Sequence, residues 1–181
     1  MKFFETLVEC EPLLRSGKIG VIRTDTIYGV VGRADSQAAV QRIYDIKGRD
    51  ADKSPIILIS SQADMLDEVD PVTADRLNEL WPGKVSVIVP SPAGPAWLER
   101  GNKSLAYRMP ADDDLLELVR QTGPLVAPSA NRQGQTPATT ITQAQEYFGD
   151  SVDFYVDGGQ VTDNTPSKLY RLVNDSLEQL R

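Results

Sequence analysis

Two apolar runs, "PIILI" at residues 55–59 and "VSVIV" at residues 85–89, decide the fold class. Both runs are rich in β-branched residues and have the length of a strand, so we expect two buried strands. The segment between them is acidic and has a helical pattern. Strands that alternate with helical segments are typical of a mixed α/β domain.

The alternation extends toward the amino terminus. We expect a helix near residues 3–15, interrupted or restarted at Pro12. A short buried strand, "KIGVIR" at residues 18–23, follows it. The next segment, "TDTIYG" at residues 24–29, is a turn-rich exit from that strand.

A second helix is predicted from its cap, its apolar face and its end. Asp35 or Ser36 can act as the N-cap. The helix ends near Lys47, and Gly48 is a natural stop. Its apolar face consists of Ala39, Val40, Ile43 and Tyr44.

The carboxyl-terminal half continues the alternation of strands and helices. We expect helices over "DDDLLELVRQTG" and around residues 141–148. The expected strands, of which two are close enough to pair as a hairpin, are "SLAYRM", "PLVA", "FYVDGG", "SKLYRLV" and "LEQL". No repeat or linker divides the chain, so residues 1–181 are expected to form one domain, which buries roughly two-thirds of its unfolded surface.

The charge and the residue inventory exclude several functions. The formal net charge of −7 opposes broad electrostatic capture of RNA or DNA, although a local basic groove is still compatible with it. The chain has no histidine, which excludes Ser-His-Asp and Cys-His hydrolases and histidine-containing zinc sites. Chemistry must therefore use carboxylates, cations, hydroxyls or backbone amides.

The amino-terminal residues and the cysteine count predict a cytoplasmic protein. Two glutamates interrupt "MKFFETLVECEPLL", where a signal peptide would need a continuous apolar segment. Cys10 is the only cysteine, so no intrachain disulfide is possible. The longest apolar runs are as short as strands, which argues against a membrane span.

The pair Lys47 and Arg49, on either side of Gly48, has three interpretations. Cations in the last turn of a helix complement its dipole, and they can do so without a ligand. The pair can instead belong to a solvated charge cluster with Asp50 and Lys53, among others. The third interpretation is a polyphosphate clamp, in which the ammonium and the guanidinium grip phosphate oxygens.

Further polar segments follow predicted strands. "LVAPSANRQG" carries Ser129 and Asn131 beyond a strand end, where open α/β sheets usually bind ligands. A simple turn is the alternative, because Asn and Ser favour turns. The crowding of polar residues in "TDTIYG" is a second such exit, whereas Asp157, Gly158 and Gly159 are common turn residues and weak evidence alone.

These segments together resemble the YrdC/TsaC family of threonylcarbamoyl-AMP synthases over nearly the whole chain. The motifs that match in order are "TDTIYG", "KGR", "WPGKVS", "LAYRMP", "PSAN", "DGG" and "PS" before the last strands. The resemblance implies a twisted YrdC-like sheet of parallel and antiparallel strands with flanking helices and a concave, positively lined cavity. There the family joins L-threonine, bicarbonate or CO2, and ATP into threonylcarbamoyl-AMP, a nucleotidyl transfer that releases pyrophosphate.

The resemblance also implies a role for individual residues. Lys47, Arg49, Ser129 and Asn131 would surround the ATP phosphates as the catalytic set. The other residues implied at ATP are Lys53, Ser104 and Arg181, and those implied at threonine are Thr24, Thr26, Tyr28, Arg108 and Ser167. Both Lys47 and Arg49 are expected past a helix end, so that their replacement would leave the fold intact.

The resemblance implies further components. Mg2+ would enter with ATP through phosphate oxygens rather than through dedicated protein ligands. The product would pass to a partner threonylcarbamoyl transferase that modifies adenosine 37 of tRNA, while direct tRNA binding is expected to be weak or absent. Two alternatives are a catalytically silent RNA-binding or regulatory paralogue and a carbamoyl-adenylate enzyme with another substrate.

Three positions depart from the family pattern. Arg23 replaces a usual proline, and Ser86 replaces a frequent threonine but keeps a hydroxyl group. Lys168 stands where a threonine usually follows Ser167. This lysine either adds a cation near the phosphates or points to solvent.

Overall fold

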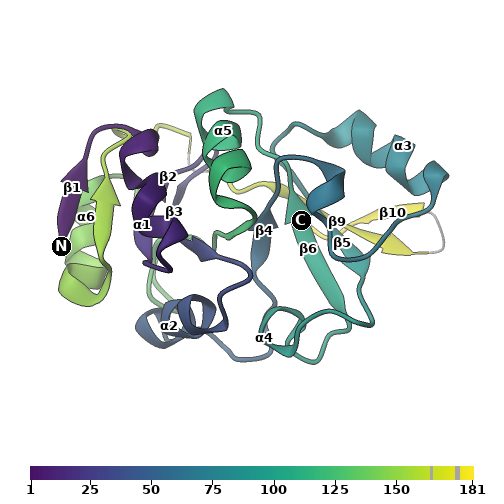
Figure 1. Ribbon diagram of the computed structural model, residues 1–181, viewed down its shortest axis with the longest axis horizontal. Coiled ribbons are helices and arrows are strands. Elements are labelled where there is room, and N and C mark those ends of the chain that lie inside the picture. The colour runs from purple at the N-terminus through teal and green to yellow at the C-terminus, as the bar shows by residue number, and fades with distance from the viewer. Residues whose placement is uncertain (164, 174–175) are drawn as a thin grey trace.

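One mixed sheet organises the computed structural model, which describes residues 1–163, 165–173 and 176–181. Within these residues ten strands follow the order β1-β8-β2-β3-β7-β4-β6-β5-β9-β10. Figure 1 shows β1 and the β9–β10 pair at opposite ends of the long axis. The strands are β1 Lys2–Phe4, β2 Gly20–Arg23, β3 Tyr28–Arg33, β4 Ile56–Leu58, β5 Val85–Pro90, β6 Ser104–Arg108, β7 Leu125–Val126, β8 Phe154–Val156, β9 Lys168–Val173 and β10 Ser176–Gln179.

The strand directions confirm the expected mixture of parallel and antiparallel pairing. The parallel pairs are β1 with β8, β8 with β2, β4 with β6, and β5 with β9. The remaining pairs are antiparallel, and they include the β9–β10 hairpin predicted from the sequence. The sheet therefore combines crossover connections with local hairpins.

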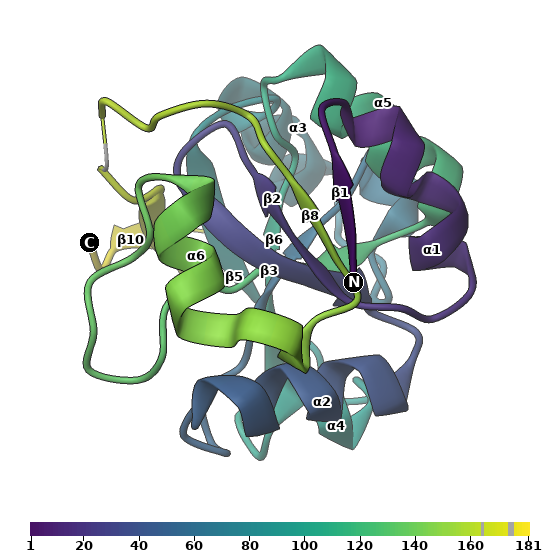
Figure 2. The ribbon, with the colours of Figure 1, turned by 90° about the vertical axis from the view of Figure 1, so that its left-hand side faces the viewer.

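Helices cover both faces of the sheet, as Figure 2 shows for α1 and α5 on one side and α2 and α6 on the other. The α-helices are α1 Glu11–Arg15, α2 Gln37–Lys47, α3 Pro71–Leu80, α4 Ala96–Glu99, α5 Asp113–Thr122 and α6 Ile141–Phe148. Short 3-10 turns are η1 Leu7–Cys10, η2 Gln62–Asp64 and η3 Gly149–Ser151. By the usual length criteria, none of the helices in the described ranges could cross a bilayer.

Neighbouring residues in the central strands belong to different cores, because successive side chains of a strand point to opposite faces. Val21 and Ile57 join the cluster beneath α2 and α6. Ile22 and Leu58 join the cluster beneath α1 and α5. The sheet thus separates two apolar layers, and both of its faces are dry in the centre.

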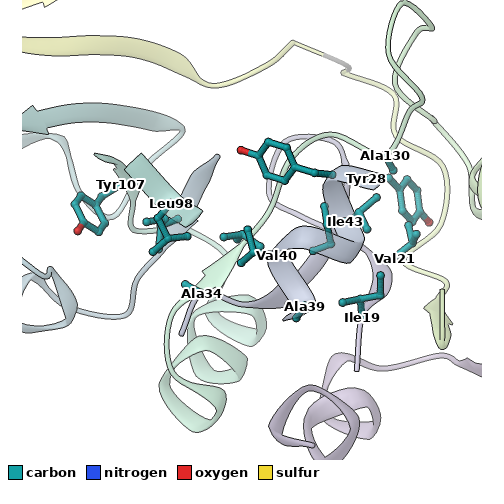
Figure 3. Packing of buried hydrophobic residues seen from close by; sticks show 14 of the residues in the cluster. Ile19, Val21, Tyr28, Ala34, Ala39, Val40, Ile43, Leu98, Tyr107 and Ala130 are labelled. Atoms are coloured by element: carbon teal, nitrogen blue, oxygen red, sulfur yellow. The ribbon is translucent and has the colours of Figure 1, made fainter. Parts of the chain in front are cut away.

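Helix α2 begins and ends as its sequence predicts. Ser36 is the N-cap, and its Oγ accepts a hydrogen bond from the amide of Ala39. Gly48 ends the helix at φ 60°, a left-handed conformation that glycine adopts without the steric cost of a Cβ. A Cβ on Gly32 of β3 would lie 3.1 Å from Ile43, so glycine permits close packing of the helix on the sheet. Figure 3 shows Ile43 within this core cluster.

The expected helix over residues 3–15 is wrong in its first part. Residues Lys2–Phe4 form β1 and pair with β8, which lies about 150 residues later in the chain. Only the 3-10 turn at Leu7–Cys10 and the short helix Glu11–Arg15 are helical. Long-range pairing overrode the local pattern here.

Strand β3 was not predicted, because "TDTIYG" was interpreted only as a turn. Residues 24–27 do turn, but Tyr28 already begins a strand that pairs antiparallel with β2. The short helix α4 was also missed. The predicted strands and helices from residue 104 to the carboxyl-terminal hairpin are confirmed.

Candidate functional site

Two adjoining cavities lie where several strands end. The first, here called the arginine cavity, has a volume of about 270 Å³. It is lined by Thr24, Thr26, Ile27, Tyr28, Gly29, Arg49, Ile56, Arg108, Ala127, Pro128, Ser129, Pro137, Pro166, Ser167 and Arg181. The second, the lysine cavity, has a volume of about 360 Å³ and is lined by Lys47, Arg49, Lys53, Ser129, Asn131, Gln133 and Gly134. Arg49 and Ser129 border both cavities.

The loop that follows β7 forms the wall between the cavities, and it is held by backbone pairing with β3. The amide of Val30 donates to the carbonyl of Pro128 over 2.9 Å, and the amide of Ala130 donates to the carbonyl of Tyr28 over 2.7 Å. Gly29 and Ser129 form an isolated bridge. This ladder brings the "PSAN" and "TDTIYG" segments together, as expected for polar residues at strand ends.

The arginine cavity is positively charged although the chain is acidic overall. Arg49, Arg108 and Arg181 line it, and none of the described lining residues is acidic. The formal net charge of the whole chain is −7. The expected concave, positively lined cavity is therefore confirmed, and it suits anionic small molecules.

Arg108 lies at the end of β6 and is only 4% exposed. Its Nη2 donates to Oδ1 of Asp25 over 2.7 Å, and its Nη1 donates to Oγ1 of Thr26 over 3.1 Å. Within the described residues, Nε is buried without a hydrogen-bond partner. Burial lowers the pKa of the guanidinium, while Asp25 acts in the opposite direction. One N–H of this fixed cation is thus buried without a partner.

Thr24, Thr26 and Tyr28, the three residues predicted at threonine from "TDTIYG", line the arginine cavity, and their hydroxyls have different hydrogen-bond partners. The hydroxyls of Thr24 and Thr26 lie 3.0 Å apart, and Thr24 also donates to the carbonyl of Ile27. The hydroxyl of Tyr28 donates to the carbonyl of Gly159 over 2.8 Å, and burial raises its pKa to about 12. Tyr28 therefore anchors the Asp-Gly-Gly turn with its hydroxyl.

Lys47 is the last residue of α2, and it is buried at 4% exposure. Its Nζ donates to the carbonyl of Ser129 and, over 2.5 Å, to the carbonyl of Asn131. No carboxylate of the described residues pairs with it. Burial, followed by the charge of Arg49, lowers the pKa of Lys47 to about 7. The expectation that Lys47 lies outside the packed structure is wrong, because the ammonium ties α2 to the loop.

Arg49 and Lys53 occupy more open positions. Nη2 of Arg49 donates to the carbonyl of Ser54 over 3.1 Å, and Nε donates to the carbonyl of Lys53 over 3.3 Å. Lys53 forms an exposed ion pair with Asp50 at 2.5 Å. The solvated-cluster interpretation therefore describes the ion pair of Lys53, which also borders the lysine cavity, whereas Arg49 borders both cavities.

Ser129 and Asn131 are joined within the loop. Oγ of Ser129 donates to Oδ1 of Asn131 over 2.5 Å. Nδ2 of Asn131 donates to the carbonyls of Arg132 and Gln135. The structure brings both residues to Lys47, as the phosphate-clamp hypothesis requires.

Ser167 closes the far side of the arginine cavity. Its hydroxyl lies 3.0 Å from that of Ser86, and both are buried. Nη2 of Arg181 donates to the carbonyl of Ser167 over 3.1 Å. Lys168 is exposed and lines neither cavity, which favours the interpretation that it points to solvent.

Two residues singled out in the sequence lie apart from the cavities. Ser104 begins β6, four residues before Arg108, and lines neither of them. Arg23 is exposed and donates to the carbonyl of Gly158 over 2.6 Å. The arginine that replaces the usual proline at position 23 thus adds a hydrogen bond to the Asp-Gly-Gly turn.

Several site residues were missed in the sequence. Asp25 was noted among the polar residues but was given no function, and its partner Arg108 is 83 residues away. Gln133 and Gly134 line the lysine cavity beside Asn131. Their only signal was their position directly after "PSAN". Across the described ranges, no cluster of three or more histidine, cysteine or acidic side chains could hold a metal ion.

The mixed sheet and its cationic cavity define an α/β domain with a small-molecule site at its strand ends. The family model Sua5/yciO/yrdC, described as telomere recombination, matches residues 12–181. The chain belongs to this family, as the sequence motifs indicated. Its fold agrees with a crystal structure of Pyrococcus abyssi Sua5 in complex with L-threonine, at a TM-score of 0.90 and 29% identity.

Several relatives of this chain are named threonylcarbamoyl-AMP synthase. The chain is 35% identical over 152 residues to the threonylcarbamoyl-AMP synthase of Pyrococcus abyssi, covering 81% of this chain and 45% of that protein. It is 32% identical to the threonylcarbamoyl-AMP synthase of Nitrosococcus oceani, covering 81% and 82%. The chain covers 57% of the solved Pyrococcus protein, and all of this chain aligns with it. Escherichia coli YciO, at 18% identity and a TM-score of 0.86, shares the fold.

Proposed function

We propose that this chain is an L-threonylcarbamoyladenylate synthase, which makes threonylcarbamoyl-AMP from L-threonine, bicarbonate or CO2, and ATP and releases pyrophosphate. The observation that carries the proposal is the pair of cavities that share Arg49 and Ser129. One cavity suits an amino-acid carboxylate, and the other suits phosphates. The names of the relatives support the same activity.

In this proposal Arg108 binds the threonine carboxylate. Two of its five N–H groups are used by Asp25 and Thr26, and Nε is buried, so the second hydrogens of the Nη nitrogens are the donors left for a ligand. The cavity of about 270 Å³ is near the lower end of small-molecule sites, which span roughly 300–1,000 Å³. Its size suits one amino acid and is too small for a segment of a polynucleotide.

Lys47 and Arg49 would bind the ATP phosphates, which lie in the lysine cavity in this proposal. The carbamate of threonine then attacks the α-phosphate beside Arg49 and Ser129, and the P–O bond to pyrophosphate breaks. The protein supplies neutralisation of charge and alignment rather than a nucleophile. Mg2+ would be held by phosphate oxygens of ATP, where it would supply further neutralisation of charge. The product would serve a separate transferase that modifies tRNA.

An assay of pyrophosphate release tests the proposal. The chain is mixed with ATP, Mg2+ and bicarbonate, with and without L-threonine. We expect release that depends on both threonine and bicarbonate. Release that is absent, or that is equal without threonine, would reject the synthase and favour a silent paralogue or another substrate.

A further inference from the structure

We infer that Tyr44 and Arg100 are positioning residues, which hold Arg49 and the loop after it in the conformation that phosphate binding requires. The inference rests on the proposed function, because it concerns the phosphate side of the same site. Tyr44 belongs to α2, and Arg100 follows α4. Figures 1 and 2 both show α4 beside α2, away from the ends of the sheet.

Tyr44 and Arg49 converge on one carbonyl. The Tyr44 hydroxyl donates to the carbonyl of Lys53 over 2.5 Å, and Nε of Arg49 donates to the same oxygen over 3.3 Å. The Arg49 guanidinium lies 5.6 Å from the centre of the Tyr44 ring. Because both contacts meet at Lys53, a shift of this carbonyl would move Arg49.

Arg100 supports Tyr44 from the other element. Its guanidinium lies 3.8 Å from the centre of the Tyr44 ring. Among the described residues, its Nε and Nη2 are buried without hydrogen-bond partners. Buried donors without acceptors are unfavourable, so the stacking on Tyr44 is the contact that accounts for the position of this side chain.

The turn at residues 99–102 holds the same loop by a second set of contacts. Nδ2 of Asn102 donates to the carbonyl of Asp52 over 2.6 Å and to Oγ of Ser54 over 3.1 Å. Oγ of Ser54 donates to the carbonyl of Glu99 over 2.9 Å. The carbonyl of Ser54 in turn accepts from Nη2 of Arg49. The turn, the loop and the arginine therefore form one connected unit.

The turn also carries backbone strain. Arg100 has a φ of 55° and Lys103 a φ of 50°, a left-handed conformation that is unfavourable for residues with a Cβ. Such residues persist where the surrounding structure determines them, and they cluster at functional sites. At Arg100 the side chain reaches Tyr44, whereas Lys103 is exposed. Arg100 and Lys103 thus share the same backbone strain, but only the side chain of Arg100 contacts a residue linked to the site.

The first test compares Tyr44→Phe with Tyr155→Phe. Both tyrosines are buried, and both hydroxyls donate to a backbone carbonyl, but Tyr155 lies in β8 and donates to Gly149 of η3. We expect only Tyr44→Phe to raise KM for ATP, roughly two- to tenfold, with KM for threonine unchanged. Hydrogen exchange at the amides of Arg49 and Lys53 should become faster in the same variant.

The second test compares Arg100→Gly with Lys103→Gly. Glycine relieves the left-handed strain at both positions, so both variants should fold and a change in KM would not reflect unfolding. Arg100→Gly should loosen the loop and raise KM for ATP, while Lys103→Gly should leave KM unchanged. Unchanged KM in both variants would overturn the role of Arg100.

The exchange measurement separates this inference from the proposed activity, because it needs no turnover. If the unmodified chain makes no pyrophosphate but Tyr44→Phe speeds exchange at Arg49, the activity is rejected and the positioning role stands. If exchange at Arg49 and Lys53 is the same in Tyr44→Phe and Tyr155→Phe, the positioning role is rejected whatever the activity.

Discussion

The two cationic ends of the site are stabilised in different ways. Arg108 has a carboxylate partner, Asp25, and both side chains are 5% exposed. Lys47 is similarly buried, but within the described ranges its ammonium donates only to carbonyl and amide oxygens. The charge of Arg108 is therefore neutralised by its partner before a ligand arrives, whereas the ammonium form of Lys47 has no such partner among the described residues. An anion should gain more electrostatic stabilisation at Lys47 than at Arg108.

The largest expected effect comes from breaking the paired end. Arg108→Ala leaves the Asp25 carboxylate buried without its cation, and the loss of one partner of a buried pair costs about 3–5 kcal/mol. Urea denaturation should show this loss in the free energy of unfolding. Amino-acid-dependent pyrophosphate release should disappear as well.

A double variant is the control for this prediction. Arg108→Met with Asp25→Asn removes both charges and should recover most of the stability, but not the activity. An Arg108→Ala protein that unfolds at the urea concentration of the unmodified chain would contradict the role assigned to the pair.

At the end of the site without a carboxylate partner, Lys47→Ala and Arg49→Ala should differ in their effects on stability and activity. Lys47→Ala leaves the carbonyl of Asn131 without its donor, at roughly 1–3 kcal/mol of stability, and removes one of the two donors to the carbonyl of Ser129. Arg49→Ala should leave stability closer to normal and lower pyrophosphate release by about one to two decades, because a charge-assisted contact is worth roughly 1.5–3 kcal/mol. Equal melting temperatures for the two variants would contradict the structural role of Lys47.

The ranking of amino acids as substrates tests the proposed threonine pocket at the Arg108 end of the site. Serine lacks only the methyl group of threonine, so its rejection should amount to roughly 1–3 kcal/mol in kcat/KM. Valine replaces the hydroxyl by a methyl group and leaves a hydrogen-bonding partner unpaired, so it should be rejected more strongly. Competition assays of pyrophosphate release should rank threonine first, serine second and valine third. Equal use of valine and threonine would exclude a pocket that recognises the hydroxyl.

The smallest expected effect is the change in ATP affinity and in stability for each unit of pH. The pKa of Lys47 is lowered from 10.5 to about 7, so above pH 7 the unfolded chain binds more protons than the folded chain. This group's contribution to stability therefore increases as the pH rises toward 10.5. Phosphate binding favours the ammonium form, so ATP affinity should decrease above pH 7 by up to about tenfold per pH unit.

Calorimetric titration with ATP across this pH range checks the decrease in affinity. Threonine binding, measured alone, should lack this pH dependence, because Arg108, the proposed partner of its carboxylate, remains protonated. Lys47→Met should flatten the ATP profile. A steep profile in that variant would assign the titration to another group.

The two ends of the site also differ in how much of each could be predicted from the sequence. The motif "KGR" pointed to a cationic site, and the "PSAN" segment pointed to the same strand ends. Both indications depend on residues close together in the chain. The partner of Arg108 could not be found in this way, because Asp25 lies 83 residues earlier and meets it only across the folded sheet.

The sequence by itself determined the local elements of this protein. Ser36 and Gly48 delimit α2, and the apolar runs at 55–59 and 85–89 contain β4 and β5. These elements follow from capping, backbone freedom at glycine and β-branched residues, which act over a few positions. The family motifs also identified residues that line both cavities.

Only the tertiary structure decided which groups are buried and how they are paired. It placed Lys47 under the "PSAN" loop, Arg100 over Tyr44, and residues Lys2–Phe4 in a strand beside β8. Each of these outcomes joins segments that are far apart in the chain. The burial of a charge and the pairing of a strand depend on what the distant segment contributes, so no local periodicity contains them.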